Sequence, residues 1–148
     1  MFGVSKISST SDVMLVSIPQ STAADMVQVL HDLKQAGVVV DMISQTIPMG
    51  GLIHFCFTMS AACFEITVAT IGRSALSPMI SGGYSKINLF GEEMAESAGV
   101  AVRALEALQQ NGTEIFLITT SDLDISLLVR SEDEDVALDA LQAAYEIS

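Results

Sequence analysis

Alternating apolar and polar stretches predict the same series of elements in both halves of this chain. Runs with an apolar residue at every second position predict strands, and a spacing of three or four predicts helices. Each half of the 148 residues reads as strand, helix, strand, strand, helix. We therefore expect an α+β protein whose antiparallel sheets carry helices on one face.

In the first half, a strand is expected over residues 12–18, ended by Pro19. Ser21 or Thr22 can cap the following helix, and Gly37 supplies a left-handed stop. The apolar face of this helix is predicted to comprise Ala23, Val27, Leu30 and Leu33. The rest of the first half is predicted to form strands at 38–44 and around Ile53, Phe55 and Phe57, a helix at 61–74 and a short strand at 78–81.

The second half repeats this order. A strand is expected at 84–90, with Ile87 and Leu89 on one face, followed by a helix at 97–110 that Gly112 stops. The predicted hairpin strands are 114–120 and 122–130, and Ser131 with Glu134 predicts a capping box for the last helix. The inward positions are expected to be Ala101, Ala104, Leu105, Leu108, Leu123, Ile125, Leu127, Ala137, Ala140, Leu141 and Ala144.

The two halves also share residues at matching places. Leu30, Leu33, Gln35 and Gly37 recur 75 residues later as Leu105, Leu108, Gln110 and Gly112. The repeat predicts two similar βαββαβ units of the ferredoxin-like type, but the second unit lacks a final strand. We expect residues 2–8 to donate it, which gives domains at 10–82 and at 2–8 plus 83–148.

Composition narrows the classes of partner. There are 18 acidic and 6 basic residues, a formal net charge of -12, which disfavours nucleic acid and anionic membrane surfaces. The N-terminus has no signal-peptide pattern, and the apolar stretch 52–71 is too interrupted for a membrane span. Cys56 and Cys63 are expected to be reduced thiols, so a cytoplasmic location is predicted.

Three segments carry a resemblance to a known family. Residues 37–45 (GVVVDMISQ), 114–129 (EIFLITTSDLDISLLV) and 131–147 resemble the tandem ACT regulatory region of aspartokinases, and residues 114–129 are the most specific. The resemblance implies ACT modules that pair side by side, a homodimer, and an N-terminal strand donated to the second module. It also implies binding of a free amino acid, lysine or threonine, at the interface between modules.

No phosphate-binding loop or other catalytic motif is present in the 148 residues. The chain therefore resembles the regulatory region without its kinase domain, and we predict no enzyme activity and no cofactor. Its partner would be a free amino acid, with a separate amino-acid biosynthetic enzyme as a further candidate partner. The alternatives are an oligomerisation or protein-interaction module that has lost effector binding and, ranked last, a small enzyme.

A free amino acid needs backbone N–H groups for its carboxylate and oxygen atoms for its ammonium. The strand end and helix start at 17–24 offer the first, and the strand edge at 39–41 with Gln45 offers the second. By resemblance, residues 114–115 face the same site. The predicted effector residues are Ile18, Gln20, Ser21, Thr22, Ala23, Val40, Asp41, Gln45, Glu114 and Ile115.

Several of these side chains also have a simpler interpretation. Asp41 is either an ammonium partner or a polar outward position on an alternating strand, and Glu114 either favours a cationic ligand such as lysine or is a solvated strand end. His54 and Cys56 lie two apart on one strand face, where a packed pair is favoured over a metal site. We therefore predict no metal.

Overall fold

The computed structural model describes residues 2–92, 94 and 97–147. These residues form an α+β fold with a six-stranded sheet in the order β2-β3-β1-β4-β6-β5 and four α-helices. The strands are β1 (Lys6–Ser21), β2 (Asp41–Gln45), β3 (Ile53–Ser60), β4 (Met79–Phe90), β5 (Leu117–Thr120) and β6 (Asp124–Arg130), and the helices are α1 (Ala23–Gln35), α2 (Phe64–Ile71), α3 (Ser97–Gln110) and α4 (Glu134–Tyr145).

Two long strands replace four short ones that the sequence predicts. β1 joins residues 6–8 of the predicted strand 2–8 to the predicted strand 12–18, and β4 joins residues 79–81 to the predicted strand 84–90. Both strands run through a left-handed residue at these junctions, Asp12 in β1 and Gly83 in β4, with φ of +54° and +85°. Pro19 does not end β1, which continues to Ser21.

The chain divides into two compact units, residues 12–82 and residues 1–11 with 83–148. We call them the middle unit and the terminal unit. Both β1 and β4 contribute residues to each unit. Whether each unit is one ACT module stays a prediction.

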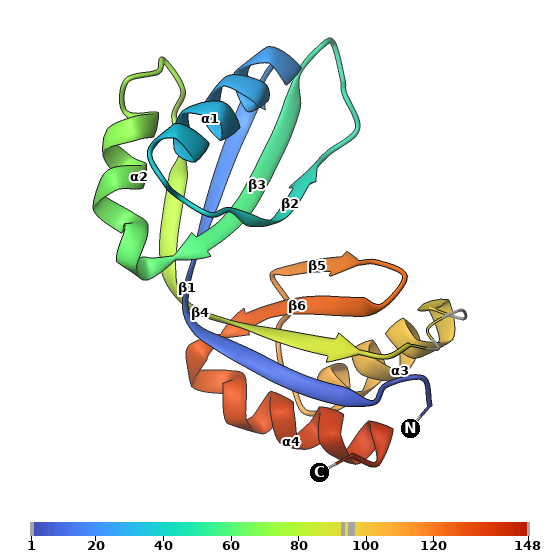
Figure 1. The fold of residues 1–148 in the computed structure, drawn as a ribbon. Helices are drawn as coiled ribbons and strands as arrows, with labels where there is room; N and C mark the ends of the chain where they lie inside the picture. The colour runs from blue at the N-terminus through green and yellow to red at the C-terminus, as the bar shows by residue number, and fades with distance from the viewer. Residues whose placement is uncertain (1, 93, 95–96, 148) are drawn as a thin grey trace. The chain divides into compact units, whose positions relative to one another are not determined.

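In the middle unit, α1 and α2 lie on one face of the strands (Figure 1). Ile53, Phe55 and Phe57 point toward this helix layer, as predicted, and are at most 3% exposed. The helix predicted at 61–74 is shorter: a 3₁₀ turn at Ala61–Cys63 leads into α2. The core of this unit comprises Val16, Ile18, Val29, Leu33, Val38, Ile53, Phe55, Phe57, Met59 and Ile71.

The predicted apolar face of α1 is rotated relative to the one observed. Val27 is 69% exposed, whereas Val29 and Leu33 are buried and Met26 and Leu30 pack beside them. The series 26, 29, 30, 33 fits helical spacing better than 23, 27, 30, 33, because it keeps one narrow stripe toward the sheet.

Both long helices stop in the same way, as the repeat predicts. Gly37 and Gly112 have φ of +82° and +77°. In α1, the N–H of Val38 donates to the carbonyl of Leu33, and in α3 the N–H of Thr113 donates to that of Leu108, both at 2.9 Å. The residues after each glycine therefore serve the helix stop, and the strands expected from 38 and 114 begin at Asp41 and Leu117.

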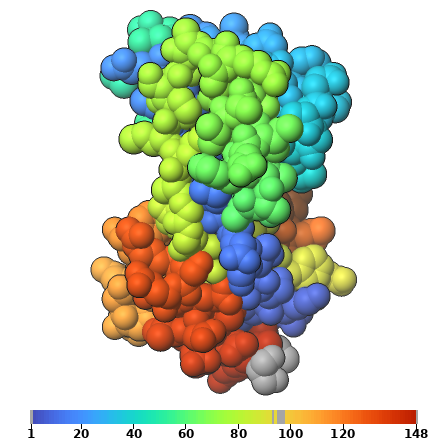
Figure 2. Space-filling view, turned by 90° about the vertical axis from the view of Figure 1, so that its left-hand side faces the viewer, coloured from blue at the N-terminus to red at the C-terminus, as the bar shows by residue number. Residues whose placement is uncertain are grey.

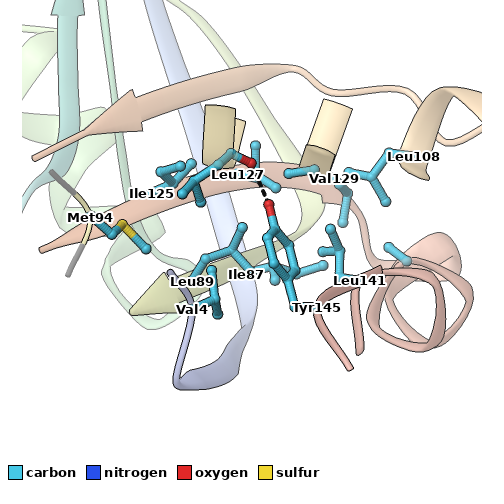
Figure 3. Close-up of a cluster of buried hydrophobic side chains, with 13 residues drawn as sticks. Val4, Ile87, Leu89, Met94, Leu108, Ile125, Leu127, Val129, Leu141 and Tyr145 are labelled. Carbon is cyan, nitrogen blue, oxygen red and sulfur yellow. Dashed lines mark hydrogen bonds between the residues drawn. The ribbon is translucent and has the colours of Figure 1, made fainter. Parts of the chain in front are cut away.

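The terminal unit packs α3 and α4 against β4 and β6. Its core contains Val4, Ile87, Leu89, Met94, Val100, Ala104, Leu108, Ile125, Leu127, Val129, Ala137, Leu141 and Tyr145 (Figure 3). Leu105 and Leu123, predicted to point inward, are 39% and 48% exposed. Val100 occupies the inner position on α3 instead.

The N-terminal residues are held closely within the terminal unit. The N–H of Ser5 donates to the carbonyl of Phe90 at 2.8 Å, and Val4 is buried in the core. A side chain at Gly91 would meet the carbonyl oxygen of Gly3 at 1.7 Å, so only glycine fits there. The guanidinium of Arg103 lies 3.8 Å above the ring of Phe2.

Tyr145 closes the core of this unit from the end of α4. Its hydroxyl donates to the carbonyl oxygen of Val100, and its side chain is fully buried (Figure 3). Burial raises the pKa of Tyr145 to about 12, against the opposing influence of Arg103. Arg103 itself donates to the carbonyl of Ala144 at 3.1 Å, at the negative end of α4.

The capping box predicted for the last helix is wrong. Ser131 begins a 3₁₀ turn, and α4 starts at Glu134 without a side-chain cap. The carboxylate of Glu134 instead accepts hydrogen bonds from the hydroxyls of Ser9 and Ser11, at 3.4 and 3.3 Å. Across the residues that the structure describes, we find no helix with the length and apolar character to cross a membrane.

Candidate effector site

The end of β1 in the middle unit has an irregular backbone. Its pairing with β3 shifts between Ile18 and Ser21, and Gln20 between them has φ of +51°. A residue with a side chain adopts this left-handed region at a cost of about 1 kcal/mol or more. Gln20 therefore supplies a backbone turn that glycine makes most easily.

Thr22 caps α1, as predicted, and forms a full capping box. Its hydroxyl accepts from the N–H of Asp25 at 3.1 Å, and the Asp25 carboxylate accepts from the N–H of Thr22 at 2.9 Å. The next two N–H groups, those of Ala23 and Ala24, point out of the helix start and have no partner within the helix. They are the donors that an incoming carboxylate would use.

Two of the predicted site residues have structural roles. The side chain of Ile18 is fully buried in the core. Ser21 is also buried, and its hydroxyl donates to the carbonyl of Pro19 at 3.2 Å. Any contribution of these two residues to a ligand would come from the backbone.

Among the predicted site residues of β2, Gln45 lies level with the end of β1, across the strand β3. It is paired with Phe55 of β3, and Phe55 is paired with Ile18 of β1. Directly paired residues project to the same face, so Gln45 lies on the helix side of the sheet, two strands or roughly 10 Å from Ile18. Its side chain is exposed, and its amide nitrogen donates a hydrogen bond to the carbonyl of Thr46 at 3.4 Å.

Asp41 lies elsewhere. It pairs with Thr58, which alternates with the inward residues Phe57 and Met59 and so projects away from the helices. A bulge at Met42, with φ of +48°, separates Asp41 from Gln45. Asp41 is exposed but already has an interaction within the chain. In the middle unit, the structure therefore brings Gln45 toward the start of α1 and places Asp41 on the opposite face.

That opposite face carries a small polar cluster. The hydroxyl of Ser17 hydrogen-bonds to Nε2 of His54, and the hydroxyl of Ser44 lies 3.0 Å from the sulfur of Cys56. All four side chains are half-buried, and Cys56 and Cys63 are both free thiols. Among the described residues, no three His, Cys, Asp or Glu side chains lie close enough to hold a metal ion.

The remaining predicted residues divide between the units. Val40 is half-buried against the core of the middle unit, and Ala23 is exposed at the start of α1. Glu114 and Ile115 belong to the terminal unit, where Glu114 is exposed and Ile115 packs against the core. The role of all these residues in ligand binding stays a prediction.

Two features of the site were not found from the sequence. The first is the capping role of Asp25, whose carboxylate occupies the helix start; the spacing of Thr22 and Asp25 by three is the signal that reveals it. The left-handed Gln20 has no comparable signal, since the turn depends on how β1 pairs with β3.

Comparison with known proteins supports the family resemblance. Residues 79–145 match the family model of the ACT domain. The aspartokinase of Pseudomonas aeruginosa is 30% identical over 128 residues, which are 81% of this chain and 30% of that protein. The aspartokinase of Bacillus sp. MGA3 is 25% identical over 141 residues, or 92% of this chain and 34% of that protein. The chain thus spans about a third of the length of these relatives.

Solved structures show the same fold. The regulatory subunit of aspartate kinase from Thermus thermophilus, in its ligand-free form, superposes with a TM-score of 0.87 at 20% identity, over 97% of this chain and 99% of that chain. The aspartate kinase of Synechocystis gives 0.88 at 22% identity, over 97% of this chain but 27% of that enzyme. Over 97% of its length the chain therefore has the fold of this regulatory subunit, and residues 79–145 match the ACT domain model.

Proposed function

We propose that this chain is a non-catalytic regulatory protein built of two tandem ACT modules of βαββαβ type, which bind a free amino acid of the lysine or threonine class. The observation that carries this proposal is the β1–α1 junction. There the left-handed Gln20 and the N–H groups of Ala23 and Ala24, which helix geometry leaves without a partner within the helix, offer a place for a carboxylate. Gln45 lies in line with it on the same side of the sheet.

The charge of the chain agrees with a cationic ligand. The net charge is -12, and Asp25 stands at the helix start itself. Acidic surroundings attract the side-chain ammonium group of lysine, whereas the side chain of threonine is neutral and gains no such attraction. We therefore expect lysine to bind more tightly than threonine.

A thermal-shift screen with the free amino acids tests the proposal. An amino acid present at about 100 times its Kd should stabilise the chain by about 2.7 kcal/mol and raise the melting temperature measurably. Titration calorimetry then gives the affinity of the best ligand. Absence of a shift with every amino acid tested would refute binding.

Variants locate the site. Gln45→Ala should weaken the affinity for the amino acid about tenfold or less, because it removes one hydrogen-bonding side chain. Gln35→Ala is the matched control, since Gln35 is equally exposed but lies at the end of α1. Asp41→Asn distinguishes the two interpretations of Asp41: a drop in affinity assigns it to the ammonium, and an unchanged affinity makes it a surface residue.

The second candidate is an oligomerisation or protein-interaction module without effector binding. The capping carboxylate of Asp25 favours this alternative, because it already occupies the helix start and repels a second carboxylate. Asp25→Asn keeps an acceptor for the N–H of Thr22 but removes the charge. Under the regulatory proposal, the Asp25→Asn variant binds the amino acid with a changed affinity. Under the alternative, neither the original chain nor the variant binds an amino acid.

A further inference from the structure

The helix α2 buries polar residues and exposes apolar ones. Its buried residues are Thr67, Thr70 and Ile71. The hydroxyl of Thr67 donates to the sulfur of Met59 at 3.0 Å, and that of Thr70 to the carbonyl of Ile66 at 2.6 Å. Two of the three inner positions are thus polar groups whose hydrogen bonds are made locally.

The exposed surface of α2 is mostly apolar, with small residues at its centre and larger apolar residues on both flanks. Phe64, Ile66 and Val68 are 42%, 46% and 41% exposed. Ala61, Ala62 and Ala69 are exposed between them, and Glu65 is the only charged residue from Ala61 to Gly72. The helix is uncovered on the face that Figure 2 shows in green. A chain with net charge -12 keeps this surface almost free of charge, which is typical of an interaction surface.

The charges at the ends of this surface are complementary to each other. Glu65 lies near the start of α2, and the exposed Arg73 follows directly after its C-terminal cap, Gly72. Gly72 keeps right-handed helical angles, so Arg73 continues the turn. Ala69 is midway, four residues from each charge.

This arrangement is self-complementary under a twofold rotation. If two α2 helices cross antiparallel with the axis at Ala69, Glu65 of each copy faces Arg73 of the other. At 3.6 residues per turn, Glu65, Ala69 and Gly72 project opposite to the buried Thr67 and Thr70. Small residues at 69 and 72 let the two backbones approach closely.

We propose that the outer face of α2 is a docking surface for a second copy of this chain, in an antiparallel twofold contact centred on Ala69 and closed by two Glu65–Arg73 ion pairs. An eight-residue helix buries less than a standard interface, so the contact is weak and depends on protein concentration. This inference does not rest on amino-acid binding, since it concerns only α2 and its flanking residues.

Charge reversal tests the pairing. Sedimentation equilibrium over about 1 µM to 1 mM covers the range of weak interfaces. Glu65→Arg places two like-charged pairs in the contact, and we expect it to weaken self-association about tenfold, as should Arg73→Glu. The double variant Glu65→Arg with Arg73→Glu exchanges the charges and should restore the original association constant.

The matched control is Asp135→Arg on α4, which changes the net charge by the same amount as Glu65→Arg on an equally exposed helix start. It should leave self-association unchanged or strengthen it slightly by reducing overall repulsion. The proposal is overturned if Asp135→Arg weakens association as much as Glu65→Arg, or if the double variant stays as weak as the single ones. A concentration-independent monomer also overturns it.

A disulfide trap tests the face directly, whatever other contacts the chain makes. Ala69→Cys is introduced into a background in which Cys56 and Cys63 are replaced by serine and alanine, with circular dichroism to check folding. Cysteines on a twofold axis approach within disulfide distance, so mild oxidation should yield covalent dimers. Ala143→Cys, equally exposed on α4, is the control. Equal yields from the two variants would contradict a specific contact at Ala69.

Discussion

The helices α2 and α4 follow the same kind of strand and 3₁₀ turn, yet their two sides carry opposite chemistry. In α4 the buried residues are Ala137, Leu141 and Tyr145, and the outer side carries acids such as Asp135 and Asp139. In α2 the buried residues include two threonines, and the outer side carries Phe64, Ile66 and Val68. The difference shows that a repeated fold element can keep its place while its outer face changes from a solvated surface to an interaction surface.

The comparison predicts unequal effects of truncating apolar side chains on the two helices. Leu141→Ala should lower the free energy of unfolding by about 3 kcal/mol, because it opens a cavity in the core of the terminal unit. Phe64→Ala should cost less than about 1 kcal/mol in the dilute protein, because that side chain is already half in water. Urea unfolding of both variants at low protein concentration measures the difference, and equal losses would contradict it.

The hydroxyl of Tyr145 gives the stability of the terminal unit a pH dependence. Its pKa is about 12 in the folded chain and about 10 when unfolded, so the unfolded state loses its proton first as the pH rises. This stability is fully present below pH 10 and is lost progressively as the pH rises toward about 12.

Tyr145→Phe should therefore lower stability at neutral pH by about 1 kcal/mol, since the bond to Val100 is lost. It should also flatten the decline between pH 10 and 12. Thermal melting of both proteins across this range checks the prediction. If the Tyr145→Phe variant loses stability between pH 10 and 12 as much as the original protein does, other groups cause the loss.

The smallest effects concern the helix starts. Thr22→Ala should destabilise the chain by about 1 kcal/mol because it removes the side-chain cap of α1. Ser131→Ala should change stability by less than about 0.5 kcal/mol, since Ser131 does not cap α4 and accepts a long hydrogen bond, 3.3 Å, from Ser85. Chemical denaturation distinguishes the two, and equal costs would contradict the cap assignments.

The parts of the fold that depend on local sequence were predicted well. The alternation of Ile53, Phe55 and Phe57 and the glycine stops at Gly37 and Gly112 are confirmed, because each depends on residues within one turn or strand. The rotation of α1 was missed because Val27 and Val29 are equally apolar, and only packing against the sheet selects Val29. The cap predicted at Ser131 is wrong because the chain enters a 3₁₀ turn before the helix begins.

The candidate site was less predictable, because strand pairing determines it. A single bulge at Met42 separates Asp41 and Gln45 onto opposite faces of β2. Nothing in the residues 41–45 alone indicates where the extra residue falls. The capping role of Asp25 was within reach of the sequence, but the turn at Gln20 depends on the shifted register with Ser21.

The division of the terminal unit between the two ends of the sequence affects how the protein is synthesised. Residues 1–11 are synthesised before the middle unit, but every other residue of their unit lies between 83 and 148. The middle unit, contiguous from 12 to 82, has its own core and is made completely before that partner exists. Translation therefore favours folding of the middle unit first, because the strands and helices that bury Val4 and Ile7 are synthesised later.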